Sequence, residues 1–508
     1  MQDLTKDNVS IELERNVASL KEILGNPDDL IVRQFKTDVI EAAVCFIDEL
    51  VNKDQVNEYV IKAILENVDK LDDTLSENGD PLSNSYESEV WPTVVNQLVK
   101  IGEIKEIKNM REVVDALLGG NTVLFVNGCK TALYMGTKGW VTKGIADPKI
   151  ESVIRGPSEA LNETIVISLS MIRRRLKDHH LRLKKYKKGE RSGTGVMLLY
   201  LDDIIDPQLI ENIDTKLNQI KIDAVMDIGY IEELVKENQL SPFPEMQYTE
   251  RPDNVVAHLL EGKFAILVDG SPNALIAPAV FTQFYTAAED YYERSIFSSL
   301  LRIVRFIALI FSLFLPSIYI ALISFHLELI PPKLAISVAS SRANVPFSSI
   351  LEIIFMELGA LILSEASIRI PAPLGSTIGI VGALVIGNAA VSAGIVSPSV
   401  IIVVALTIIA SYASPSYNAS WAIRLVRYGM IGMVAFFGLY GVAISSLLLF
   451  LHLLNLKSFG VPYLSPILPF TWADIKDTWW RAPWKFMNKR PRIFRPKDKI
   501  RLQGGEEH

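Results

Sequence analysis

The sequence predicts an α/β soluble region of two duplicated lobes, followed by an α-helical polytopic membrane domain. Charged residues are frequent up to about Glu293, whereas residues 305–456 are mostly Ile, Leu, Val, Ala, Gly and Ser. That second part contains apolar runs long enough to cross a bilayer. A stretch of the soluble part also recurs at a fixed distance along the chain, which indicates duplication.

The soluble part begins with residues 1–34, which we interpret as a flexible extension. Their start lacks the apolar core of a signal peptide, so we expect this region to be cytoplasmic. Residues 35–150 form the first predicted α/β lobe. Its two cysteines, Cys45 and Cys129, lie in apolar runs and read as buried reduced thiols rather than as a disulfide or a metal site.

The repeat is the clearest pattern in the soluble part. Residues 111–134 and 253–276 align without gaps at an offset of 142 residues. Each copy reads as a helix with the pattern VVxxLL on one face, a glycine stop, a strand, a turn and a returning strand. We therefore predict a second lobe over residues 193–293. A cleft between the lobes would suit a small ligand, and the lobes would equally serve to assemble subunits.

Residues 151–192 join the predicted lobes. We expect a mostly helical connector ending in a basic loop, because residues 173–191 contain ten Lys or Arg and two acids. A solvated surface, contact with an anionic lipid or acidic partner, and nucleic acid are the available interpretations. No nucleic-acid-binding signature accompanies the run, so we expect no nucleic acid partner.

Residues 294–470 form the predicted membrane domain, with about four spanning helices. The candidates are residues 305–325, 374–396, 398–411 and 428–454. A fifth apolar segment, 350–370, carries Glu352, Glu357 and Glu365. Charges at bilayer depth are costly, so we interpret it as an intramembrane or interfacial helix whose acids lie near a vestibule. A purely interfacial helix without a transport role is the alternative.

Topology follows from the charges at the end of the chain. Residues 471–508 form a basic tail, with nine Lys or Arg between Arg481 and Arg501, and Trp residues at its start suit the lipid headgroups. We expect this tail to be cytoplasmic, like the amino-terminal region. Two ends on one side require an even number of crossings, which four spans satisfy.

A stripe of small residues marks the most informative membrane segment. Four of them recur at every fourth position, namely Gly375, Gly379, Ala383 and Gly387. Such a stripe lets a neighbouring helix approach closely. The other faces of the same helix carry Val381, Val385, Asn388 and Ser392. We interpret these four residues as pore-lining candidates in an oligomer, and ordinary helix packing within one subunit is the alternative.

Motifs of enzymes are missing from the sequence. It has no phosphate-binding loop, dinucleotide fingerprint, nucleophile elbow or HExxH or CxxC motif, and its six histidines are scattered. We therefore expect a protein that is not an enzyme and that has no cofactor, no catalytic residues and no metal site.

Several strings in consistent order resemble the A subunit of GerA-type spore germination receptors. They include Ser-Val-Ile-Arg-Gly-Pro-Ser-Glu at 152–159, Leu-Val-Asp-Gly-Ser-Pro at 267–272, Glu-Asp-Tyr-Tyr at 289–292, Ile-Val-Gly-Ala-Leu-Val-Ile-Gly at 380–387 and Ser-Phe-Gly-Val-Pro-Tyr-Leu at 458–464. The resemblance runs from about residue 35 to 492. The chain departs from the family pattern at residues 158–161, at 363–366 and at Asn388, which indicates a divergent member.

The resemblance implies a multi-pass receptor subunit in the inner membrane of bacterial spores. Its partners would be a transporter-like B subunit, which binds the nutrient germinant, a lipoprotein C subunit, further copies of itself in a ring, and membrane lipids. The implied activity is an ion-conducting path that releases monovalent cations when the germinant binds. The alternative is a cytoplasmic ligand-binding or scaffold module that the membrane part only anchors.

Overall fold

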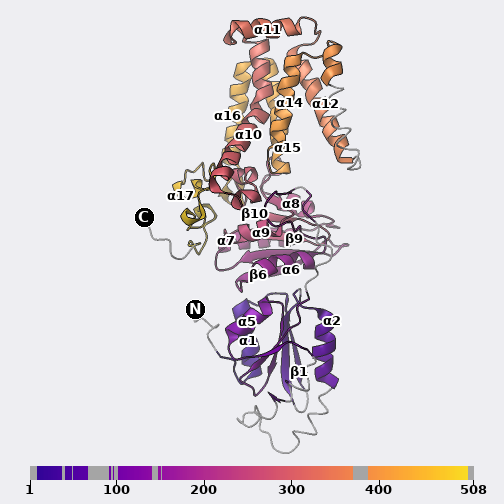
Figure 1. The fold of residues 1–508 in the computed structure, drawn as a ribbon, viewed down its shortest axis with the longest axis vertical. Coiled ribbons are helices and arrows are strands. Elements are labelled where there is room, and N and C mark those ends of the chain that lie inside the picture. Colours follow the sequence, from indigo (N-terminus) through magenta and orange to yellow (C-terminus); the bar gives the residue numbers. More distant parts are fainter. Residues whose placement is uncertain are drawn as a thin grey trace, which may run out of the picture. The chain divides into compact units, whose positions relative to one another are not determined.

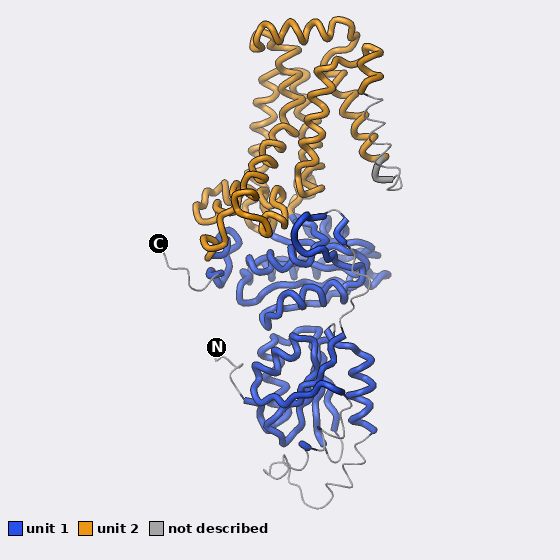
Figure 2. The backbone as a smooth tube through the Cα atoms, in the orientation of Figure 1, with its two compact units in different colours: residues 1–236, 246–278, 489–503 blue, residues 237–245, 279–488, 504–508 orange. Residues whose placement is uncertain are grey.

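The structure is a computed structural model that describes residues 8–36, 40–48, 50–66, 91–92, 95, 101–139, 147–149, 151–369 and 387–501. The chain divides into two compact units (Figure 2). Unit 1 comprises Met1–Lys236, Met246–Pro278 and Lys489–Gln503, and unit 2 comprises Glu237–Glu245, Ala279–Asn488 and Gly504–His508. Unit 1 contains both α/β lobes, and unit 2 contains the apolar helices.

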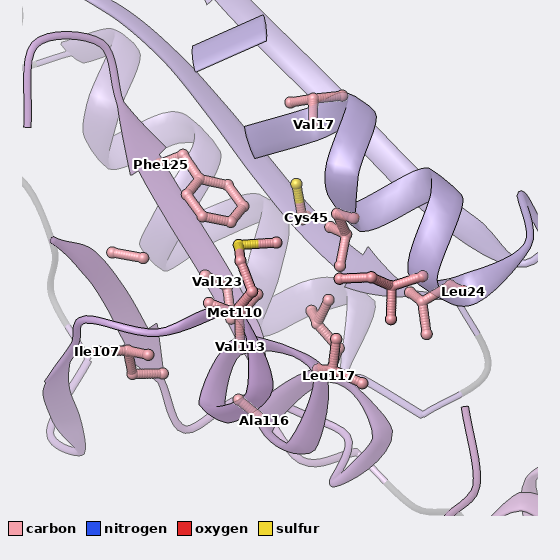
Figure 3. Packing of buried hydrophobic residues seen from close by; sticks show 14 of the residues in the cluster. Val17, Leu24, Cys45, Ile107, Met110, Val113, Ala116, Leu117, Val123 and Phe125 are labelled. Atoms are coloured by element: carbon pink, nitrogen blue, oxygen red, sulfur yellow. The ribbon is translucent and has the colours of Figure 1, made fainter. Parts of the chain in front are cut away.

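The first lobe is an antiparallel sheet between two helical layers (Figure 1). Its elements are α1 (Leu13–Leu24), β1 (Leu30–Lys36), β2 (Glu41–Ile47), α2 (Lys53–Gln55) continuing as the π-helix η2 (Val56–Ile61), β3 (Ile104–Ile107), α5 (Met110–Leu118), β4 (Thr122–Val126) and β5 (Ala132–Met135). The strand order is β1-β2-β4-β5-β3. Alternate residues of β2 face opposite layers, because side chains of a strand point to alternate faces. Figure 3 shows the layer in which Cys45 packs with Leu24 and Leu117.

The second lobe repeats this architecture. Its elements are α6 (Ile165–Arg175), β6 (Leu181–Lys188), β7 (Thr194–Leu201), α7 (Pro207–Gln219), α8 (Ile228–Val235), β8 (Gln247–Thr249), α9 (Pro252–Leu259), β9 (Phe264–Val268) and β10 (Ala274–Ala277). The strand order is β6-β7-β9-β10-β8, which matches the first lobe strand for strand. Helices α6 and α9 share one hydrophobic cluster with the sheet.

The duplication predicted from residues 111–134 and 253–276 is therefore visible in the fold. Strands β4 and β9, and β5 and β10, begin 142 residues apart. Gly128 and Gly270 both have φ of +88° in the tight turns between these strands, a conformation that favours glycine. The residue before each glycine accepts a hydrogen bond from the first backbone N–H of the lobe's leading helix: Asn127 caps Leu13, and Asp269 caps Ile165, both at 3.1 Å.

Those equivalent helices correct two sequence interpretations. Residues 1–34 do not form only a flexible extension, because α1 and β1 lie there and Leu20 is fully buried. Residues 151–192 are not a helical connector with a basic loop, because they supply α6 and the edge strand β6 of the second lobe. An edge strand with one solvated face tolerates many lysines, which hid the strand pattern in the sequence.

The basic residues of this segment hold the two lobes of unit 1 together. Arg173 forms an ion pair with Asp29 at 2.6 Å, and their side chains are 3% and 0% exposed. Lys185 donates two hydrogen bonds to Asp28, from its backbone N–H to the carboxylate at 2.9 Å and from its Nζ to the backbone carbonyl at 3.3 Å. Arg182 donates to the carbonyl of Leu24. Three residues of the basic run therefore join the second lobe to the first.

The segment Lys489–Gln503 also belongs to unit 1. Residues 489–501 lie on the second lobe, where Arg490 donates to the carbonyl of Leu260 at 2.8 Å and Lys497 N–H donates to the carbonyl of Ile204 at 2.7 Å. Phe494, in the 3₁₀ turn η8 (Arg492–Phe494), is buried, and the Lys263 ammonium lies 4.3 Å from its ring centre. This part of the expected basic tail is a docked strap.

Unit 2 is mainly helical. It contains the 3₁₀ turns η4 (Phe281–Tyr285), η5 (Ala288–Tyr291), η6 (Leu327–Leu329) and η7 (Trp484–Phe486), the helices α10 (Ser295–Ser324), α11 (Pro332–Arg342), α12 (Ser349–Arg369), α14 (Pro398–Tyr412), α15 (Tyr417–Phe437), α16 (Leu439–Asn455) and α17 (Trp472–Ile475), and the strands β11 (Lys457–Ser458) and β12 (Val461–Pro462). Among the described residues, α10 alone is long and apolar enough to cross a membrane, while α14 and α16 are apolar but shorter.

The predicted span 428–454 is not one helix. Gly438 breaks it with φ of +56° and ψ of −131°, and a Cβ there would lie 2.9 Å from the Phe325 ring at the end of α10. After α16, Ser458 bonds the N–H of Ala279, which precedes α10. Helices α15 and α16 pack together and therefore run in opposite directions along α10. The sequence did not predict this turn, because residues 428–454 are apolar throughout and a single glycine is a weak signal for a helix break.

Candidate functional site

A buried polar centre joins three helices of unit 2. Glu357 of α12 pairs with Arg427 of α15 at 2.8 Å, and the two side chains are 3% and 1% exposed. Arg427 also donates to the carbonyl of Ser312 in α10 at 2.9 Å and to its hydroxyl at 3.3 Å. A charge this deeply buried needs such a partner, so the three helices are fixed to one another at this level.

A second buried acid lies nearer the start of α12. Glu352 is fully buried and pairs with Arg342 of α11 at 3.1 Å. Its other carboxylate oxygen accepts the backbone N–H of Ser397, the N-cap residue of α14, at 2.7 Å. Glu352 therefore connects the end of α11 to the start of α14, and it stabilises a helix N-terminus with negative charge.

These contacts decide what the predicted vestibule acids do within one chain. Glu352 and Glu357 face neighbouring helices and are engaged by guanidinium groups, so neither side chain is available to a water-filled vestibule in this arrangement. Glu365, on the following turns of α12, is exposed. The segment 350–370 is thus a 21-residue helix packed into the bundle through its acids.

Two of the pore-lining candidates lie in the described part of the chain. Asn388 and Ser392 are exposed and belong to a helical stretch over residues 387–392. They are four residues apart, so they share one helix face. Nothing lies within 4 Å of a Cβ built on Gly387. The remaining candidates, Val381 and Val385, and the packing residues Gly375, Gly379 and Ala383, lie outside the described residues.

A third charged cluster holds the start of α10. Asp290 is 1% exposed and accepts bonds from Arg302 at 3.1 Å and from Arg305 at 2.8 Å. Arg302 also pairs with Asp477 at 2.8 Å. Sequence analysis did not identify this cluster. The available signal was the spacing of the two arginines, which puts them on one face of α10, facing the quoted Glu-Asp-Tyr-Tyr string.

The three acids of these clusters have the same kind of partner. Glu352, Glu357 and Asp290 each accept hydrogen bonds from an arginine. Carboxylates that are paired with arginines in this way hold neighbouring helices together. A helical bundle fixed by a few ion pairs has discrete packing arrangements, which suits a protein that transmits a conformational change.

Comparisons with known proteins place the chain in a family. Residues 18–493 match the family model described as Bacillus/Clostridium GerA spore germination protein. The chain is 39% identical over 494 residues to the Bacillus cereus spore germination protein GerLA, covering 96% of this chain and 97% of that one. It is 37% identical to the Bacillus subtilis membrane protein YfkQ, over 97% of this chain and 93% of that one.

A solved structure is also similar. The crystal structure of the N-terminal domain of the A subunit of the Bacillus megaterium spore germinant receptor GerK3 aligns with a TM-score of 0.41 and 29% identity, covering 55% of this chain and 98% of that chain. Because the family model spans most of the sequence and relatives above 30% identity align over nearly their whole length, the chain belongs to the GerA family of spore germination proteins, as a receptor A subunit.

Proposed function

We propose that this chain is the membrane subunit of a nutrient receptor for spore germination and forms an oligomeric, ligand-gated ion path. Germinant binding to a transporter-like B subunit would open the path and release monovalent cations. The proposal places the chain in the spore inner membrane as a multi-pass protein, with a lipoprotein C subunit as a further partner. The soluble lobes would hold the ring of subunits together.

The observation that carries the proposal is the exposed polar face at Asn388 and Ser392. A polar side chain exposed at membrane depth needs water or a partner. The buried charges of the bundle are already satisfied, because Glu357 faces Arg427 and Glu352 faces Arg342. Asn388 and Ser392 therefore remain as a polar, uncharged face, which suits a cation path formed between copies of the chain.

The route of the chain supports the predicted topology. The second lobe ends at Pro278. The docked strap begins at Lys489 and contacts this same lobe. The chain thus leaves unit 1 and returns to it, which requires an even number of crossings between these points. Helices α15 and α16 replace the single predicted span 428–454, so the four predicted spans become five, and an even number requires one more crossing, for which the 21-residue α12 is the candidate.

Features near the start of α10 support contact with lipids. A cavity of about 520 Å³ is lined by apolar and basic residues, including Ile296, Trp472, Lys476, Trp480 and Phe486. Trp472 and Trp480 are 73% and 47% exposed. Exposed tryptophans beside a basic residue are typical of the membrane–water interface.

The chain offers a clean test, because both of its cysteines are buried. Burial also raises the pKa of the Cys45 thiol to about 12, so this thiol is unreactive at neutral pH. The variant Asn388→Cys would be reconstituted with its B and C subunits in liposomes loaded with K⁺. We expect germinant to trigger K⁺ efflux, and a charged, water-soluble thiol reagent to block it.

The matched control is Ile402→Cys. Ile402 of α14 is 61% exposed and lies in a fully apolar run, so we expect it to face lipid and the reagent to leave efflux unchanged. Efflux that the reagent leaves unaltered at position 388 would contradict the assignment of the pore face. Absence of germinant-dependent efflux, together with saturable germinant binding to this chain alone, would favour the alternative of an anchored ligand-binding module.

A further inference from the structure

A group of potential metal ligands lies in unit 1. The loop between α6 and β6 presents Asp178, His179 and His180, and the loop after β7 presents Asp203. Ligand atoms of the first three residues all lie within 4.8 Å of one another. These side chains are about one-third exposed, so an ion from solvent has access to them.

We propose that Asp178, His179, His180 and Asp203 form a binding site for a divalent transition-metal ion of the Zn²⁺ class. The donor set of two imidazoles and two carboxylates matches the ligands that Zn²⁺ takes in proteins. Two deprotonated carboxylates and two neutral imidazoles carry a charge of −2, which a divalent cation neutralises. The proposal departs from the expectation from the sequence that the chain has no metal site.

The distances suit such an ion. His180 Nδ1 lies 3.0 Å from Asp178 Oδ1 and 3.9 Å from Asp203 Oδ2, and His179 Nδ1 lies 3.8 Å from Asp178 Oδ1. Four ligands placed tetrahedrally at about 2.1 Å from Zn²⁺ are separated by about 3.4 Å. These three separations bracket that value, and Asp203 would join the other ligands by rotation of its side chain toward His180.

One carboxylate oxygen of the cluster has no other role. Asp203 Oδ1 is buried and makes no hydrogen bond. An orphaned buried acceptor is costly unless a cation or water satisfies it. Its partner oxygen faces His180, so a metal ion between the two loops would stabilise Asp203 directly.

The surroundings hold the ligands in place. Arg182 donates to the carbonyl of His179 at 2.7 Å and reaches the carbonyl of Leu24 in the first lobe. On the other side, the Nζ of Lys497 in the docked strap donates to the carbonyl of Asp202 at 2.8 Å. The candidate site therefore lies where the joint between lobes and the strap both fix a ligand-bearing loop, and backbone fixed in this way orients metal ligands.

The test uses the full chain, purified in detergent and freed of metal with a chelator. Titration with Zn²⁺, and with Co²⁺ as a spectroscopic probe, should give one equivalent of tight binding and the visible absorption of Co²⁺ in a low-symmetry nitrogen and oxygen site. We expect His180→Gln and Asp203→Asn each to weaken binding by at least about 10-fold. Zn²⁺ should raise the Tm of the wild type and not of these variants.

The matched control is His326→Gln. His326 also lies beside a carboxylate, Glu328, at 3.5 Å, and belongs to no such cluster among the described residues. This variant should bind Zn²⁺ as the wild type does. Wild-type affinity in both His180→Gln and Asp203→Asn, or no stoichiometric binding by the wild type, would overturn the proposal. Since the readout is metal binding by this chain alone, it is independent of ion conduction.

Discussion

Replacing Arg427 with methionine should destabilise the helical unit strongly. The substitution puts a shorter, uncharged side chain in place of the guanidinium that is bonded to Glu357, whose side chain is 3% exposed. It also removes two hydrogen bonds to Ser312. Loss of one partner of a buried ion pair costs about 3–5 kcal/mol, because the other charge stays buried and unpaired.

The same reasoning predicts the behaviour of the double variant. Glu357→Leu combined with Arg427→Met removes both charges, so we expect a stability within about 1 kcal/mol of the wild type. Thermal unfolding in detergent, followed by tryptophan fluorescence, suits this measurement because all tryptophans except Trp91 and Trp140 lie in unit 2. A cycle of the two single variants and the double variant gives the coupling free energy.

Arg424 supplies the matched control for this cycle. It lies one turn earlier in α15 and is half-buried, with its guanidinium 4.7 Å from the Trp421 ring centre. Arg424→Met should cost about 1 kcal/mol or less, the scale of a cation–π contact at an accessible site. The reasoning is refuted if Arg427→Met costs no more than Arg424→Met, or if the double variant loses the sum of both single losses.

Three further predictions concern unit 1. Arg173→Met should destabilise the contact between the lobes by about 3–5 kcal/mol, because buried Asp29 loses its ion-pair partner. Hydrogen exchange would detect this loss as faster amide exchange in β1 and β6. Burial raises the pKa of Glu151 from 4.5 to about 7, so the folded state prefers the protonated acid; the stability that this group contributes is complete below pH 4.5 and is lost as the pH rises through 7. Roughly 2–3 kcal/mol should disappear across that window in urea unfolding, and Glu151→Gln should flatten the profile. Phe494→Ala should release the docked strap to proteolysis at a cost of about 3 kcal/mol, whereas Phe486→Ala, at a 64% exposed position, should not.

Much of the soluble fold is readable from the sequence because repeats and alternation are local patterns. The paired glycines Gly128 and Gly270 and the VVxxLL helices identify the same supersecondary unit twice, and the structure confirms both copies. The strand β6 was not predicted from the sequence because its exposed face is lysine-rich. The helix α1 was not predicted because only its packing on the sheet distinguishes it from a flexible extension. Edge and terminal elements depend on neighbours far along the chain.

In the candidate site, too, the sequence predicted single residues but not their partners. The sequence identifies Glu352 and Glu357 as unusual charges in an apolar helix, but their partners Arg342 and Arg427 lie 10 and 70 residues away. No spacing rule links residues so far apart. Three of the proposed metal ligands, Asp178, His179 and His180, are adjacent in the sequence, and only Asp203 is brought to them by the pairing of β6 with β7.

The sequence by itself determined that this protein joins a duplicated α/β region to an apolar helical region, and it identified the family. Composition and periodicity carry this information because burial and secondary structure select residue types locally. The tertiary structure decided that the basic run is an edge strand and a joint, that the tail returns to the second lobe, and that the acids of α12 face arginines. These outcomes depend on which distant surfaces meet, and burial of a charge is tolerated only where its partner arrives from another element.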